Sequence, residues 1–261
     1  MRTPPTTPAS TTPLPRRAFL KGVLAAGSAS IIATERLLAA DALPSTSGRG
    51  AGGEGLPQAN TAPHAYTLPA PKLDGRISVE KTLKTRRSLR KFQNKELTQE
   101  QLSQLLWSAY GITAPPRFRT SPSAGGTYPL EIYAAVGNVK GIQPGLYKYI
   151  PREHKITQTI NTDIRPELTQ ASLNQRMITA APVTLIWTAV FERTTARYGD
   201  RGIKYVHMEI GHSSQNVYLQ ATALNLGTCA IGAFTDKKIT DLLQLPPKEA
   251  PLYLMPVGFV E

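Results

Sequence analysis

The sequence is poor in the residues that build metal centres and disulfides. It has one cysteine, Cys229, and four histidines among 261 residues. A single cysteine excludes an intramolecular disulfide and a cysteine-based zinc site. None of the histidines has a paired ligand spacing, which argues against a histidine-rich metal centre. No apolar run reaches the ~18–20 residues that a membrane-spanning helix needs.

Two nucleotide-binding signatures are also missing. The chain contains neither a GxGxxG dinucleotide fingerprint nor a GxxxxGK[ST] phosphate loop. What it does have is positive charge, because 30 Lys and Arg stand against 18 Asp and Glu, for a formal net charge of +12. That balance invites a nucleic-acid interpretation, and the position of the charges must decide it. The length suits one globular core or two small ones.

The first 42 residues have the order of parts that defines a secretory signal. Arg16-Arg17 and Lys21 form a basic start, residues 22–34 are uncharged and mostly small or apolar, and Ala40-Asp41-Ala42 offers a cleavage site. The arginine pair followed by Phe-Leu-Lys resembles a twin-arginine (Tat) signal. The alternative is an internal amphipathic helix with a chance arginine pair. We predict a Tat signal peptide over 1–42, and therefore a periplasmic or otherwise exported protein that uses the Tat machinery.

The next segment, 43–75, is one third glycine and proline: six Gly and five Pro, with Ser and Thr between them. Such a composition buries too little apolar surface to offset the entropy of ordering it. We predict a flexible linker over 43–75, its last part extended on the fold, and a single α+β domain over 76–261. Cleavage after Ala42 would leave 261 − 42 = 219 residues.

Hydrophobic periodicity predicts the elements of this domain. Helices are expected where apolar residues recur every three or four positions, and strands where short apolar or β-branched runs end at glycine or proline. Thr98 to Gln101 has the form of a capping box. Helices are predicted over 77–86, 98–110, 201–226 with Gly227 as its cap, and 236–243; strands over 130–137, 145–150, 183–190, 228–232 and 252–257.

The positive charge is densest over 81–95, with seven Lys and Arg and no acidic residue. Three interpretations stay open on composition alone: a solvated helix end, a nucleic-acid patch, or a compact phosphate site. The patch is disfavoured because only Phe92 supplies an aromatic ring and no recognition-helix pattern is present. Arg86, Arg87 and Arg90 could grip a phosphate as bidentate forks, with Ser88 as a short hydroxyl donor.

Two further segments are candidates for chemistry. Residues 119–129 are small and polar, so their backbone could approach a planar ligand closely, although an ordinary connecting loop has the same composition. Lys204 and Tyr205 stand near the start of the long predicted helix, where a cation or the helix dipole could tune a tyrosine for proton transfer. Taken alone, a surface lysine and a packed tyrosine are the commoner interpretation. Gly211 within that helix indicates close packing against another helix or a ligand.

Together these segments resemble the nitroreductase superfamily of FMN enzymes, in particular its SagB/ThcOx-type dehydrogenase branch. The resemblance covers about residues 68–261 and is carried by four motifs. These are Arg86-Arg87-Ser88-Leu89-Arg90, the SPSAGGTYPLEIY run over 121–133, the RGIKYVHMEIGHSSQN run over 201–216, and Gly227-Thr-Cys-Ala-Ile-Gly-Ala-Phe234.

The resemblance implies a three-layer sandwich, a mixed β-sheet flanked by helices, that forms a homodimer and binds FMN. It places Arg86, Arg87, Ser88 and Arg90 on the FMN phosphate and ribityl chain. It places Pro122, Ser123 and Ala124 on the flavin across the dimer interface, Gly232 and Ala233 beside the isoalloxazine ring, and Lys204 and Tyr205 in proton transfer.

The implied reaction is hydride transfer between an organic substrate and flavin N5, as in azoline oxidases acting on modified peptides. An NAD(P)H-dependent nitro or quinone reductase on the same fold, and a non-catalytic flavin-binding protein, remain alternatives. The expected partners are a small-molecule or modified-peptide substrate and a second copy of the chain. No metal, no nucleic acid and no stable membrane span are expected, since the flavin supplies the redox chemistry.

Overall fold

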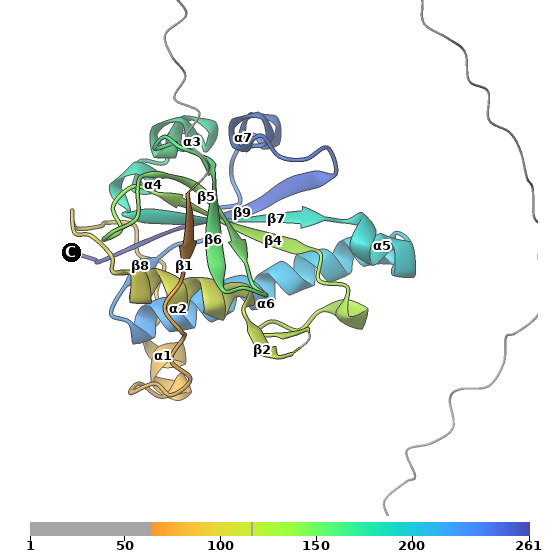
Figure 1. Cartoon of the computed structure of the whole chain (residues 1–261), viewed down its shortest axis with the longest axis horizontal. Coiled ribbons are helices and arrows are strands. Elements are labelled where there is room, and N and C mark those ends of the chain that lie inside the picture. The colour runs from red at the N-terminus through yellow and green to blue at the C-terminus, as the bar shows by residue number, and fades with distance from the viewer. Residues whose placement is uncertain (1–63, 116) are drawn as a thin grey trace, which may run out of the picture. The chain divides into compact units, whose positions relative to one another are not determined.

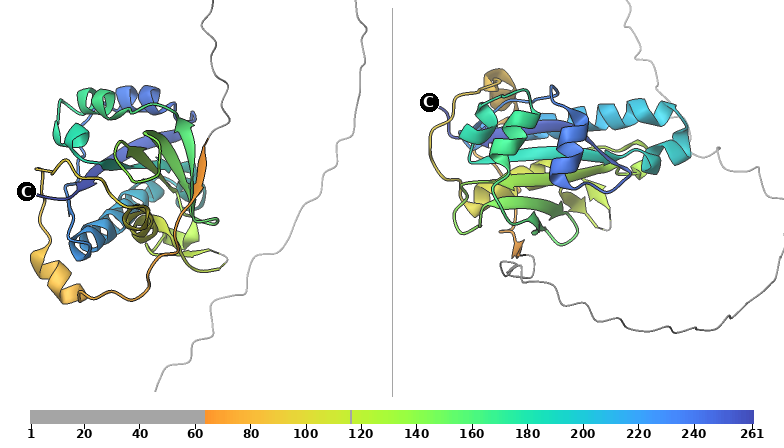
Figure 2. Two further views of the ribbon diagram at one scale, coloured as in Figure 1. Left: turned by 60° about the vertical axis from the view of Figure 1, so that its left-hand side comes forward. Right: turned by 90° about the horizontal axis from the view of Figure 1, so that it is seen from above.

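The computed structural model describes residues 64–115 and 117–261. The predicted signal peptide over 1–42, its cleavage site and the linker up to residue 63 lie outside the described residues. The described part is an α+β sandwich of three layers, with one β-sheet between two layers of helices (Figure 1; Figure 2). This is the predicted fold class.

One seven-stranded sheet forms the middle layer, in the order β1-β6-β5-β4-β7-β9-β8. All pairs of its named strands are antiparallel, and a parallel bridge between Ser88 and Thr228 extends the sheet at the β8 edge. The strands are β1 (Ala65–Thr67), β4 (Leu130–Val136), β5 (Gly145–Ile150), β6 (Lys155–Ile160), β7 (Val183–Val190), β8 (Gly227–Thr228) and β9 (Glu249–Gly258); β2 (Ile112–Ala114) and β3 (Phe118–Arg119) pair separately.

Helices cover both faces of the sheet. On one face, the long α6 (Arg201–Ala223) and α2 (Gln99–Tyr110) pack on a core that includes Trp187. On the other, α3 (Arg165–Ala171), α4 (Met177–Ala180) and α7 (Asp236–Leu243) enclose a second core that includes Tyr133. Because both faces are covered, β7 is buried along nearly its whole length and its sequence is almost continuously apolar.

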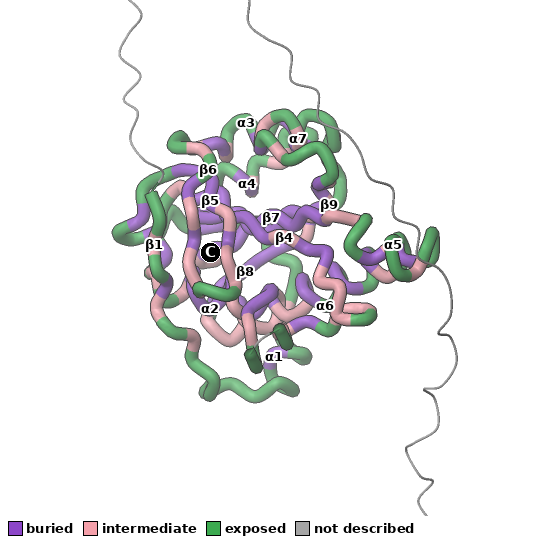
Figure 3. The backbone as a smooth tube through the Cα atoms, turned by 45° about the vertical axis from the view of Figure 1, so that its right-hand side comes forward, coloured by how far each residue is buried: buried purple, intermediate pink, exposed green. Residues whose placement is uncertain are grey.

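Two helices extend from the ends of this body. In α1 (Val79–Thr85) and in α5 (Glu192–Tyr198) only one residue each is buried, Thr82 and Thr194 respectively (Figure 3). The short 3-10 turn η1 (Ala124–Gly126) lies beside α5. These mostly exposed elements therefore lie at the two ends of α6, where the candidate site residues are found.

Local sequence signals account for much of this architecture. The capping box at Thr98 and Gln101 forms as predicted, and α2 ends at Gly111. The predicted strands over 145–150 and 183–190 have the predicted bounds. The cap predicted for the long helix is wrong. That helix ends at Ala223 with Leu224 as its C-cap, and Asn225 adopts the left-handed backbone (φ 56°) in which a glycine was expected.

Gly227 instead begins β8, where its missing side chain matters for packing. A Cβ atom there would lie 2.1 Å from Cγ1 of Val260 and 3.0 Å from Cβ of Leu89. Hydrophobic periodicity could not show this contact, because Leu89 and Val260 are remote in sequence.

The folded part also begins before residue 76. Strand β1 pairs with β6, Leu68 is buried, and the backbone N–H of Leu68 donates to the carbonyl of His154. The His154 ring in turn lies within hydrogen-bonding distance of the Pro69 carbonyl and of Ser103 on α2. Residues 65–69 are thus part of the domain, because backbone pairing and the burial of Leu68 offset the ordering cost that composition alone suggested.

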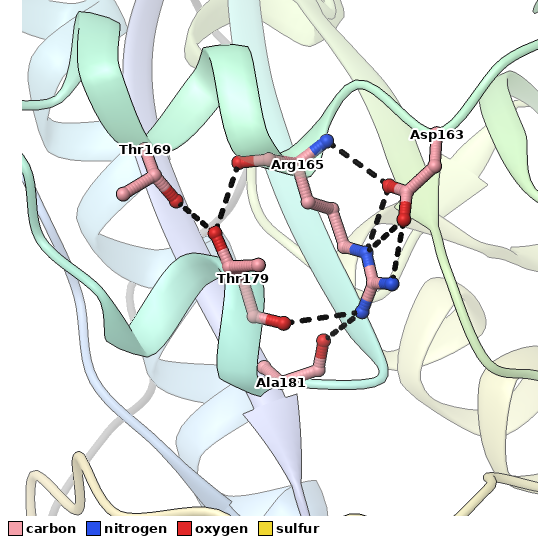
Figure 4. A network of polar contacts seen from close by, with 5 residues as sticks. All are labelled: Asp163, Arg165, Thr169, Thr179 and Ala181. Carbon is pink, nitrogen blue, oxygen red and sulfur yellow. Dashed lines mark hydrogen bonds and ion pairs between the residues drawn. The ribbon is translucent and has the colours of Figure 1, made fainter.

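Arg165 joins α3, α4 and the start of β7 through a polar network (Figure 4). Its guanidinium pairs with Asp163 at 2.7 Å and donates to the Ala181 carbonyl at 2.6 Å. The side chain passes over Gly137, where a Cβ atom would lie 1.6 Å from the guanidinium carbon. The glycine is required there for space.

We therefore expect Gly137→Ala to destabilise the fold by about 1–3 kcal/mol, the usual cost of overpacking. Urea unfolding followed by circular dichroism measures it. Gly75→Ala is the matched control, because its new Cβ would have only an ordinary 3.9 Å contact. Equal stability of the two variants would contradict the packing role of Gly137.

In the described part of the chain, no helix is both long and apolar enough to cross a bilayer, and no cluster of three His, Cys, Asp or Glu side chains could hold a metal ion.

Candidate active site

The basic segment meets the C-terminal half of α6. Ser88 and Tyr218 share a hydroxyl hydrogen bond of 3.0 Å, and the Arg86 guanidinium lies 5.3 Å from the centre of the Tyr218 ring. The segment is fixed to the sheet edge because the N–H of Leu89 donates to the carbonyl of Thr228 at 3.0 Å. Arg86 ends α1 as its C-cap. The fold thus presents this segment on a rigid strand edge and a rigid helix.

These cations are available to an anion. Arg86 is half-buried, and Arg87 and Arg90 are exposed. Among the described residues, no acidic side chain forms an ion pair with any of the three. Arg87 donates to the carbonyls of Lys84 and Arg86, and Arg90 to that of Ser88 at 3.4 Å. Uncompensated guanidinium groups next to a serine hydroxyl fit the phosphate of FMN in charge and donor type.

Tyr218 connects this segment to a second part of the predicted site. Its hydroxyl accepts a hydrogen bond of 2.8 Å from the backbone N–H of Ala230. Two residues further along, Gly232 and Ala233 are exposed, and a Cβ atom at Gly232 would meet the Tyr253 ring at 3.5 Å. The structure therefore brings the 86–90 segment and the 230–233 segment to the same end of α6. The sequence analysis did not identify Tyr218, whose role depends on this tertiary contact.

The remaining predicted residues lie at the other end of α6. The Tyr205 ring packs edge-on against that of Tyr198, with centroids 5.2 Å apart, and the Arg201 guanidinium is 5.7 Å from the Tyr205 ring. The Tyr198 hydroxyl also borders η1, 2.6 Å from the position of a Cβ atom on Gly125. Pro122–Ala124 directly precede Gly125, so this loop and Tyr205 share one end of the molecule. The Lys204 side chain is exposed.

A single chain does not unite these two groups. Tyr205 and Tyr218 are separated by 13 residues of α6, which is about 20 Å at a rise of ~1.5 Å per residue. Figure 1 shows α1 near one end of α6 and α5 at the other. The candidate phosphate ligands and the candidate proton-transfer residues therefore lie apart within one chain.

A buried polar cluster lies beneath the 119–124 loop. Glu209 of α6 is 2% exposed, and the Tyr110 hydroxyl donates to its Oε1 atom. The Arg119 guanidinium covers the rings of Tyr110 and Tyr128, 4.2 and 4.9 Å from their centres. Burial raises the pKa of Glu209, against the hydroxyls of Ser123 and Tyr110 and the charge of Arg119, which lower it. Burial and the neighbouring Glu209 raise the pKa of Tyr110.

Comparison with known proteins identifies the fold. A profile described as "Nitroreductase family" matches residues 83–259. The chain belongs to the nitroreductase family. A Methanocaldococcus jannaschii protein assigned to the nitroreductases is 51% identical over 182 residues, covering 70% of this chain and 91% of that protein. A solved structure from Ralstonia eutropha, also assigned to the nitroreductases, has a TM-score of 0.67 and 26% identity, covering 76% of this chain and 90% of that one.

A more distant similarity concerns peptide modification. The chain is 26% identical over 168 residues to the microcin B17-processing protein McbC of Escherichia coli, covering 61% of each protein. In redox enzymes the cofactor carries the electron chemistry, and the protein supplies binding and orientation. The guanidiniums of Arg86, Arg87 and Arg90, which have no acidic partner among the described residues, and the Ser88 hydroxyl suit the phosphate of such a cofactor.

Proposed function

We propose that this protein is an exported FMN-dependent oxidoreductase of the SagB/ThcOx type that acts as a homodimer. The observation that carries the proposal is the group of three guanidiniums that have no acidic partner in the described part of the chain, fixed beside Ser88 and Tyr218 at the sheet edge. This group suits a phosphate monoester. The similarity to McbC supports an organic substrate such as an azoline-type heterocycle in a modified peptide.

The separation of the site residues along α6 supports a site shared between two subunits. The exposed face of α6 includes Ile203 (44% exposed) and Met208 (53%), and α1 exposes Val79 (62%) and Leu83 (53%). A Cβ atom on Gly211, on the same exposed helix, would meet none of the described residues of its own chain within 4 Å. A second copy on this face would bury these apolar groups, and a stable homodimer should bury well over ~2,000 Å² in total.

Each group would have a distinct task in such a dimer. Arg86, Arg87, Ser88 and Arg90 of one subunit would hold the phosphate, and Gly232 and Ala233 of that subunit would border the flavin ring. Pro122, Ser123 and Ala124 of the other subunit would close the ring's environment from across the interface. Bound FMN would supply the two-electron redox chemistry. The Tyr205 hydroxyl would exchange a proton with the substrate, and Lys204 would assist that transfer.

The first test is direct. Protein without the first 42 residues, purified and incubated with FMN or FAD, should retain FMN with an oxidised-flavin absorption spectrum. A colourless protein after loading would favour a non-catalytic member of the fold and would contradict the proposal.

An NAD(P)H-dependent nitro or quinone reductase is the second candidate, on the strength of the M. jannaschii relative. An exported enzyme has no NAD(P)H pool outside the cytoplasm, so we propose that its organic substrate or a membrane partner reduces the flavin. Stopped-flow mixing with NADH or NADPH should therefore reduce it slowly, if at all. Fast, saturable reduction by either nucleotide would support the reductase instead.

Export is tested separately. Changing Arg16 and Arg17 together to lysine should leave FMN-loaded precursor in the cytoplasm, because the arginine pair carries the resemblance to a Tat signal. Cell fractionation and immunoblotting measure this, with Arg2→Lys as the matched control outside the motif. Normal export of the double-lysine variant would remove the basis for a Tat route.

A further inference from the structure

Glu209 is a buried acid that the proposed mechanism does not use. It lies one helical turn beyond Tyr205 on α6 and is 2% exposed. Its Oε1 atom accepts a hydrogen bond from Tyr110, while Oε2 is buried and has no hydrogen-bond partner in the described part of the chain. An ionised carboxylate at this depth requires compensation at both oxygens.

The cation that faces Glu209 does not supply that compensation. The Arg119 guanidinium stacks over Tyr110 and Tyr128, and its Nη1 atom donates to the Tyr110 carbonyl at 3.4 Å. Its Nε atom is itself buried without a partner, and no ion pair joins Arg119 to Glu209 among the described residues. Glu209 therefore lacks the partners that an ionised carboxylate requires, and the arginine beside it is held by aromatic rings.

The 121–128 loop above Glu209 contains unfavourable backbone conformations that neighbouring groups must stabilise. Gly125, Gly126 and Tyr128 have φ values of 60°, 64° and 49°, and the positive φ of Tyr128 is a conformation that non-glycine residues adopt at a cost. Two serines of this loop face the acid. The Ser121 hydroxyl donates to the backbone carbonyl of Glu209 at 3.5 Å, and Ser123, whose hydroxyl lies near the carboxyl, accepts from the N–H of Tyr128 at 2.9 Å.

We propose that Glu209 is a positioning residue that stays protonated in the working protein. The proton lies on Oε2, the oxygen to which no described group donates, with the Ser123 hydroxyl nearby as its acceptor, and Tyr110 donates to Oε1. The acid thereby links α2, α6 and the 121–128 loop and fixes Pro122–Ala124 in the conformation presented to the second subunit. The inference rests on the proposed function, since this loop is the one assigned to the partner's flavin.

Infrared spectroscopy tests the protonation without any flavin. The wild-type protein near neutral pH should show a carbonyl stretch of a protonated carboxylic acid, and Glu209→Gln should remove it. Glu249→Gln is the matched control: Glu249 is also buried (5% exposed), but it forms an ion pair of 3.7 Å with the Lys148 ammonium, so this substitution should leave the band in place. Tyr110→Phe, which removes only a hydroxyl, should shift the band. An unchanged band in Glu209→Gln would overturn the proposal.

Stability against pH gives a second measurement with a defined sign. Because the pKa of Glu209 is raised in the folded state, the folded protein binds the proton more tightly than the unfolded chain. The free energy of unfolding should therefore fall as pH rises from the ordinary glutamate pKa through the raised one. The groups facing the acid are Tyr110 on α2 and Arg119 on β3. Glu209→Gln should lack this loss, and an identical pH dependence in variant and wild type would contradict the inference.

Flavin binding completes the test. Glu209→Gln keeps a neutral side chain that can still donate, so its FMN dissociation constant should stay within about threefold of wild type. Glu209→Ala leaves the loop without its donor and should weaken FMN binding about tenfold or more. Equal losses in the two variants would overturn the positioning role. A wild-type protein that binds no FMN would refute the proposed function, while the infrared and stability measurements would still decide the state of Glu209.

Discussion

A protein carrying both Arg86→Ala and Arg90→Ala should bind FMN about 10²–10⁴-fold more weakly than wild type. Each charge-assisted phosphate contact contributes on the order of 1.5–3 kcal/mol, and each 1.4 kcal/mol is about tenfold in affinity. Neither arginine forms an ion pair with an acidic side chain in the described residues. Their removal therefore leaves no carboxylate unpaired. The loss should therefore appear in cofactor affinity and not in folding.

Fluorescence titration of the apoprotein with FMN measures this loss, and circular dichroism confirms the fold. Lys237→Ala with Lys238→Ala is the control, because it removes two exposed cations from α7 on the opposite face of the sheet; of the two, Lys237 has an acidic partner, the exposed Asp241. Stoichiometric FMN in the Arg86/Arg90 double variant would refute the phosphate assignment.

Mixed dimers should recover activity that neither parent has. One parent carries Arg86→Ala and Arg90→Ala, and the other carries Tyr205→Phe, which alone should lose about 10²–10⁴-fold in turnover. If each site takes its phosphate residues from one subunit and Tyr205 from the other, a mixed dimer has one intact site and one doubly altered site. Random mixing at equal concentrations should then restore about one quarter of wild-type activity, because half of the dimers are mixed and each has one working site of two.

The opposite architecture gives the opposite result. If the phosphate residues and Tyr205 of one chain served the same site, every site in a mixed dimer would be defective and mixing would restore nothing. The ~20 Å of helix between Tyr205 and Tyr218 is the reason to expect recovery. Arg86→Ala with Arg90→Ala and Tyr205→Phe placed in the same chain, mixed with wild type, measures how well subunits exchange.

The sequence predicted the elements whose signals are local. Helix α2 has its capping box and its apolar spacing, and β7 has a mostly apolar run between Pro182 and Phe191, in which Thr184 and Thr188 are the only polar residues. Strand β6 was not predicted. Its buried residues alternate, but its Thr and Gln residues interrupt the apolar pattern by which a strand is recognised in the sequence. The early start of the domain at β1 was missed for a related reason: three residues become a strand only through pairing with β6.

For the candidate site too, the sequence indicated local features but not tertiary placement. Motif resemblance gave the residue types that could bind a phosphate or move a proton. It could not show that α6 places the two groups at opposite ends, because that depends on how α1 and α5 pack. The contacts of Tyr218 and Glu209 could not be predicted from the sequence either. Tyr218 pairs with Ser88 and Glu209 pairs with Tyr110, and the two residues of each pair are more than 90 positions apart.

The length of α6 has a consequence for how the two sites of a dimer behave. One continuous helix would carry Tyr205 for one site and Tyr218 for the other, so it would couple the positions of the two redox centres. A displacement of the helix along its axis would change both centres in the same event. Inserting or deleting a turn would put both out of register together, whereas the loops at either end can vary singly. Substrate preference is therefore free to diverge in those loops while the span between the centres stays constant.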